Sequence, residues 1–158
     1  MTIDDIPVIA PYFRFVTTNT CDFTVGGMFM WRDYFHMAWQ VKDGVLYSTL
    51  TGEDGNLYYN LPLGEDIPAG LRQCLTCHPE RPVRFCTIPE AELPLFRALP
   101  GRVEITEEEN FADYLYSAEE MIRLSGKKFS GQRNHISRFL RTCQSWSFEP
   151  LDNTDAAE

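Results

Sequence analysis

The stretch Leu124-Ser-Gly-Lys-Lys-Phe-Ser-Gly-Gln-Arg-Asn-His-Ile136, here called the basic segment, lies between two predicted helices. Residues 121–141 carry six basic residues and no acidic one, whereas residues 1–120 carry 8 basic and 19 acidic residues. The whole chain of 158 residues has a formal net charge of −9. This acidity argues against a general nucleic-acid coat protein, but the basic segment leaves room for one local anion site.

The length and composition are those of one ordinary globular domain, with 44% hydrophobic and 13% aromatic residues. No apolar run approaches the roughly 20 residues of a membrane span. The N-terminus, with Asp4 and Asp5, lacks the basic and apolar regions of a signal peptide. We therefore expect a cytoplasmic protein whose five cysteines are mostly free thiols.

The clearest local signal in the first two thirds of the chain is Asp43-Gly44, a strong turn sequence between strands predicted at 37–41 and 45–50. Proline at position 68 favours the first turn of a helix. The other elements expected up to residue 105 are helices at 3–15, 21–32, 68–77 and 89–99, and strands at 56–63, 82–88 and 103–105.

Two helices are expected to flank the basic segment. Ser117 and Glu120 form a capping-box pattern, and Gly126 is expected to end that helix in the left-handed conformation. After the basic segment, Ile136, Phe139, Leu140 and Cys143 have the spacing of a helix face that packs into a core. A final strand is predicted at 146–148.

These elements predict an α/β fold with a mixed, mostly antiparallel sheet flanked by helices. We expect a single domain over residues 1–150, followed by a tail or truncated linker at 151–158.

The segment Cys74-Leu-Thr-Cys77-His78 matches the pattern of c-type haem attachment, and its thiolates and imidazole also suit zinc. A structural zinc site would need a second close pair of ligands, which the chain lacks. We therefore interpret these residues as the end of an amphipathic helix and predict no metal. No nucleophile elbow or catalytic triad is recognisable, so the catalytic residues are unknown.

The basic segment has two interpretations. In the first, it is a solvated positive helix face that complements acidic residues upstream. In the second, it is an anion site, in which Lys127, Lys128 and Arg133 supply charge around glycine-rich backbone. The N-terminus of the following helix adds a dipole that favours phosphate.

Several motifs carry a resemblance to a known family. They are Cys21-Asp-Phe23, Met30-Trp-Arg-Asp-Tyr34, Tyr114-Leu-Tyr116, Leu124-Ser-Gly-Lys-Lys-Phe129 and Gln132-Arg-Asn-His-Ile-Ser-Arg-Phe139. Together they resemble a bacterial family of unknown function related to the C-terminal domain of phosphatidylglycerol lysyltransferases. Such proteins hold two GNAT-like (N-acetyltransferase-like) domains in tandem. The resemblance implies a GNAT-like fold and the N-terminal half of such a pair, or a short relative.

The resemblance also implies a function, because related aminoacyltransferases take an aminoacyl group from charged tRNA. The expected activity is that of an acyl- or aminoacyltransferase-family domain whose phosphate-bearing donor is charged tRNA or a coenzyme A thioester. The expected partners are tRNA, and a second GNAT-like domain or a second copy in a homodimer. The alternative is a non-catalytic half with a structural or ligand-binding role. The residues implied to hold the phosphate group are Lys127, Lys128, Arg133, Asn134, His135 and Arg138.

Overall fold

The computed structural model describes residues 1–149, in which the chain is a mixed α/β protein with six α-helices and one three-stranded sheet. The chain divides into two compact units, Met1–Asp113 (unit 1) and Tyr114–Glu158 (unit 2). The mixed α/β class predicted from the sequence is confirmed. The single domain over 1–150 and the GNAT-like topology stay predictions, and the tail at 151–158 lies outside the described residues.

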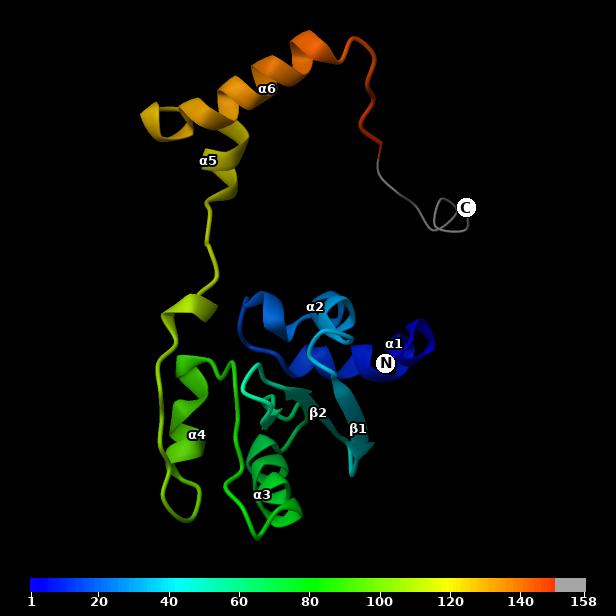
Figure 1. Cartoon of the computed structure of the whole chain (residues 1–158), viewed down its shortest axis with the longest axis vertical. Helices are drawn as coiled ribbons and strands as arrows, with labels where there is room; N and C mark the ends of the chain where they lie inside the picture. Colours follow the sequence, from blue (N-terminus) through cyan, green and yellow to red (C-terminus); the bar gives the residue numbers. More distant parts are fainter. Residues whose placement is uncertain (150–158) are drawn as a thin grey trace. The chain divides into compact units, whose positions relative to one another are not determined.

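The sheet of unit 1 is antiparallel, in the order β1-β2-β3, with β1 at Ala38–Lys42, β2 at Val45–Thr51 and β3 at Leu57–Tyr59 (Figure 1). Lys42 pairs with Val45 across the predicted turn. Asp43 and Gly44 both have positive φ, 51° and 75°, as a two-residue turn that follows the strand twist requires. The predicted hairpin is confirmed.

Short helices surround this sheet, and α3 packs against β2 (Figure 1). Local side chains determine where two of them begin: the Thr24 hydroxyl accepts from Gly27 N at 2.9 Å, and Asp66 Oδ1 accepts from Ala69 N at 2.8 Å. The α-helices of unit 1 are α1 (Ile6–Ile9), α2 (Val25–Trp31), α3 (Ile67–Cys77) and α4 (Leu93–Arg97). The 3-10 helices are η1 (Ile3–Asp5), η2 (Ala10–Phe15), η3 (Cys21–Phe23), η4 (Glu90–Glu92) and η5 (Glu109–Phe111).

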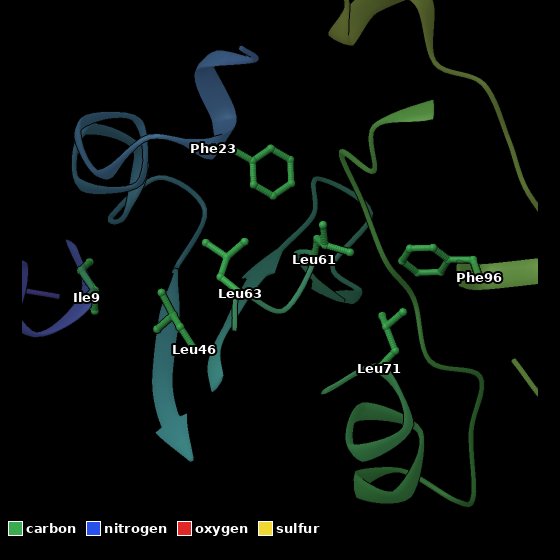
Figure 2. Packing of buried hydrophobic residues seen from close by; sticks show 7 residues of the cluster. All are labelled: Ile9, Phe23, Leu46, Leu61, Leu63, Leu71 and Phe96. Atoms are coloured by element: carbon green, nitrogen blue, oxygen red, sulfur yellow. The ribbon is translucent and has the colours of Figure 1, made fainter. Parts of the chain in front are cut away.

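The hydrophobic core of unit 1 draws one residue each from α1, η3, β2, α3 and α4, and two from the segment between β3 and α3 (Figure 2). Ile9, Leu46 and Leu71, from α1, β2 and α3, are almost fully excluded from solvent. The remaining members of the cluster are Phe23, Leu61, Leu63 and Phe96. Burial of this set, rather than helix propensity, holds such short helices in place.

Two strands predicted in unit 1 do not form. Residues 82–88 contribute one isolated parallel bridge, between Phe85 and Tyr59. Pro82 has no N–H to donate, and Thr87 has a φ of 52°, which turns the chain away from the extended conformation. Val103 and Ile105 also form no strand, and they are 38% and 45% exposed.

Unit 2 contains α5 (Ala118–Arg123), η6 (Lys127–Phe129) and α6 (Ser130–Thr142), so both predicted helices are present. The Ser117 hydroxyl caps α5 by accepting from Glu120 N at 3.4 Å. The residue that ends α5 in the left-handed conformation is Leu124 (φ 46°, ψ 36°), and not Gly126 as predicted. Gly126 also has a positive φ, 85°, but its ψ of 176° is extended, and it is the N-cap residue of η6.

The predicted core face of α6 is exposed in the structure, which corrects the expectation from its spacing. Ile136, Phe139 and Leu140 are 48%, 45% and 52% exposed. Residues 146–148 form no strand; instead, the Trp146 ring packs edge-on against Phe139 with centroids 5.8 Å apart. The helical spacing identified the apolar face of α6, but it could not show whether other residues bury that face.

Candidate anion-binding site

The basic segment forms the junction of α5, η6 and α6, and two of its cations are held by unit 2 itself. Lys128 Nζ lies 2.7 Å from Glu120 Oε1 and 5.0 Å from the centre of the Phe129 ring. The capping-box pattern would direct the Glu120 side chain at Ser117. In the structure, this side chain pairs with Lys128 instead. Phe129, 6% exposed, anchors this turn.

Arg133 has a structural role at the same junction. Its Nη1 donates to the carbonyl oxygens of Leu124 and Gly126, the latter at 2.8 Å. Carbonyl groups at a helix C-terminus lack intrahelical partners, and a guanidinium is well suited to satisfy them. Arg133 therefore joins the first turn of α6 to the end of α5, and this guanidinium nitrogen is engaged within the chain.

The other predicted site residues are exposed and unengaged. Within residues 1–149, the side chains of Lys127, Asn134, His135 and Arg138 make no hydrogen bond or ion pair. Arg141, which was not among the predicted site residues, is in the same condition. These side chains are the ones available to a ligand.

Helix geometry separates these polar side chains from the apolar face. Successive residues of an α-helix are rotated by about 100°, so residues four and seven positions apart share a face. Asn134, Arg138 and Arg141 have that spacing and lie opposite the face that contains Ile136 and Leu140. We call Lys127, Asn134, Arg138 and Arg141 the basic face. The spacing of Arg141 from Arg138 was the signal that would have identified it from the sequence.

The N-terminus of α6 adjoins Lys127. Its N-cap position is Phe129, which has no side-chain acceptor, and no side chain caps the helix. The backbone N–H of Ser130, the first residue of α6, already donates to the Lys127 carbonyl oxygen, so the helix dipole is the feature of this end that favours an anion. The arrangement can attract a phosphate group by the dipole of α6 and by the point charges of the basic face.

The Cys74–His78 segment is used structurally. His78 Nε2 lies 3.1 Å from the Tyr59 hydroxyl, and Nδ1 lies 3.2 Å from Arg81 Nη2. A guanidinium only donates, so Nδ1 accepts and Nε2 carries the proton. Burial raises the pKa of Cys74 to about 12, which keeps it a thiol. In the described part of the chain, no three His, Cys, Asp or Glu side chains are grouped to hold a metal ion.

None of the helices within residues 1–149 is both long enough and apolar enough to cross a membrane.

The chain combines a mixed α/β fold with a basic helical unit, and comparison with known proteins identifies its family. The family described as "Phosphatidylglycerol lysyltransferase, C-terminal" matches residues 13–158. The chain belongs to this family, which relates it to a transferase domain. The resemblance stated from the sequence is confirmed.

A crystal structure titled a conserved protein of unknown function from Bacteroides thetaiotaomicron VPI-5482 is similar to this chain. The two share 28% sequence identity with a TM-score of 0.70. The match covers 96% of this chain and 52% of the other, so this chain spans about half the length of that relative. No curated protein matches the sequence.

Proposed function

We propose that this chain is an acyl- or aminoacyltransferase-family domain that binds a phosphate-bearing donor, charged tRNA or a coenzyme A thioester. Membership of the lysyltransferase C-terminal family supports the reaction class. The main support for the binding site is that Arg138 and Arg141 lie on one face of α6. Neither side chain makes an ion pair within residues 1–149. The same donors imply a cytoplasmic location.

The geometry favours a donor with several phosphates. Arg138 and Arg141 are separated along the α6 axis by about 4.5 Å, and the uncharged Asn134 lies about 6 Å before Arg138, at 1.5 Å per residue. Lys127 extends the positive charge beyond the start of the helix. Three separate cations, Lys127, Arg138 and Arg141, match a polyphosphate or a nucleic-acid backbone better than a single phosphate group, and such binding weakens with salt.

In the proposed reaction, an acceptor amine or hydroxyl attacks the activated carbonyl of the donor. The ester C–O bond to tRNA or the thioester C–S bond to coenzyme A then breaks, and the leaving hydroxyl or thiol takes up the proton that the acceptor loses. The basic face would hold the phosphate-bearing end of the donor, so that its carbonyl is positioned for attack. Positioning and stabilisation of the oxyanion supply the catalysis, and no covalent nucleophile is needed.

The alternative is that this chain is a non-catalytic structural or ligand-binding half of a two-domain protein. The observation that favours it is the coverage of about half of the structural relative. The exposed apolar face of α6 fits this alternative, because a second GNAT-like domain or a second copy of this chain would cover it.

Titration of unacylated tRNA and of coenzyme A at low salt, followed by fluorescence anisotropy, tests the binding site. The variant Arg138→Gln with Arg141→Gln should bind about tenfold more weakly, and the dependence of binding on salt should become shallower. The matched control replaces Arg72 and Arg97, two exposed arginines on helices of unit 1, with glutamine. If both double variants bind equally well, the basic face is not the donor site.

A further inference from the structure

A groove with a volume of about 800 Å³ lies wholly within unit 1. It is formed by η2, the β1–β2 turn and the first turns of α3. Its volume is in the range typical of small-molecule sites. About half of the lining is apolar, and this part includes Val8, Pro11, Phe15, Val45 and Ala69.

The charged groups of this groove are mostly acidic. Asp43, Glu65 and Asp66 line it, against one guanidinium, Arg14. Asp66 caps α3, but Asp43 and Glu65 make no hydrogen bond or ion pair within residues 1–149. Arg14 forms no ion pair with these carboxylates within residues 1–149, and its guanidinium lies 4.7 Å from the centre of the Phe15 ring. The groove therefore presents free carboxylate acceptors beside an apolar surface.

Two half-buried tyrosines complete the lining. Tyr12 and Tyr47 both border the groove, and neither hydroxyl has a hydrogen-bond partner within residues 1–149. Burial is the main cause that raises the pKa of Tyr47, with further contributions from Cys74 and Asp43, so its hydroxyl stays protonated. A neutral aromatic ring attracts a cation through its face, and a neutral phenol also accepts a hydrogen bond from an ammonium group.

We propose that this groove binds a small organic cation, an alkylammonium group on an apolar chain, with Asp43 and Glu65 as its charge partners. The carboxylates receive the ammonium hydrogen bonds, while the tyrosine rings and the aliphatic wall contact the alkyl chain. The carboxylates would repel an anionic ligand. A ligand with an uncharged alkyl chain would leave the carboxylates without a charge partner. The inference concerns unit 1 alone, so its failure would leave the proposed donor site in unit 2 untouched.

The test uses three probes that share a five-carbon chain: cadaverine, pentanediol and glutarate. Each is titrated into the whole chain at low salt, and amide chemical shifts report the affinity and the location of binding. Cadaverine should bind at least about tenfold more tightly than pentanediol, and glutarate should not bind. The shifts that move should belong to residues that line the groove.

The variant Asp43→Asn with Glu65→Gln should weaken cadaverine binding at least about fivefold. Asparagine keeps the turn intact, because Asn-Gly is also favoured where both residues have positive φ. The matched control, Glu107→Gln with Glu108→Gln, removes the same charge from unit 1 at exposed residues outside the groove and should change affinity less than about twofold.

Three results would overturn the proposal. The first is a cadaverine dissociation constant larger than about 10 mM, because binding that weak would not indicate a specific site. The second is pentanediol or glutarate binding as tightly as cadaverine. The third is an equal loss of cadaverine affinity in the groove variant and the control variant. That result would mean that cadaverine responds only to the overall negative charge of unit 1.

Discussion

Two glycines of unit 1 allow the backbone contribution of the β1–β2 turn to be measured without a steric complication. A methyl group added at Gly44 or at Gly26 would meet no atom within 4 Å. The two positions differ in conformation: Gly44 has a φ of 75°, whereas Gly26 lies in α2 with ordinary helical backbone. Alanine at each position therefore isolates the effect of φ.

The expected changes have opposite signs. Alanine in the left-handed region is strained by about 1–2 kcal/mol. Alanine also lowers the conformational entropy of the unfolded chain, and this offsets about 0.4–1 kcal/mol of the strain. Gly44→Ala should thus lower the free energy of unfolding by about 1 kcal/mol. Gly26→Ala has no such strain and should raise it by about 0.5–1 kcal/mol.

Urea unfolding followed by circular dichroism measures both variants against the unchanged chain. The midpoints should move in opposite directions with the same slope, because neither variant alters the surface exposed on unfolding. A Gly44→Ala protein as stable as the parent would refute the left-handed turn. A destabilised Gly26→Ala protein would refute the assignment of Gly26 to an open helical position.

The cysteines and Asp113 give three further predictions. Cys74 is buried, with a pKa raised to about 12, so iodoacetamide at pH 8 should alkylate the exposed Cys77 well before Cys74, as peptide mass spectrometry can measure. Simultaneous labelling would contradict the burial of the Cys74 side chain. The Asp113 carboxylate accepts from Cys21 N at 2.8 Å and from Cys21 Sγ at 3.1 Å, and this hydrogen bond is the main cause that raises the pKa of Cys21. Asp113→Asn should therefore increase the thiolate fraction and the alkylation rate of Cys21, and an unchanged rate would show that the contact does not persist in solution. The pKa of Asp113 is lowered by the same contact, so its stabilising effect should be present above the usual carboxyl pKa of 3.8 and disappear as the pH falls through the lowered value.

Much of the secondary structure was predictable because its determinants are local. Asp43-Gly44 specifies a tight turn by itself, since both residues tolerate positive φ. Ser117 caps a helix that begins at the next residue, and the proline at position 68 opens α3. Such features need only a few neighbouring residues, so no knowledge of the rest of the chain was required.

Strands and helix ends were less predictable where they depend on distant partners. Residues 103–105 alternate as a strand does, but a strand also needs a neighbour with free backbone groups, and none pairs with them within residues 1–149. Leu124 ends α5, although Gly126 was the residue with the lower conformational strain. Arg133, nine residues further on, donates to the Leu124 carbonyl and stabilises that ending.

The sequence by itself determined the concentration of positive charge at residues 121–141, the amphipathic pattern of α6 and the family motifs. Only the tertiary structure separated Lys128 and Arg133, which are held by Glu120 and by backbone carbonyls, from Arg138 and Arg141, which are available to a ligand. The groove of unit 1 likewise combines three segments that are distant in sequence. The physical reason is that charge and periodicity are properties of the chain, whereas pairing and burial depend on which distant groups the fold brings into contact.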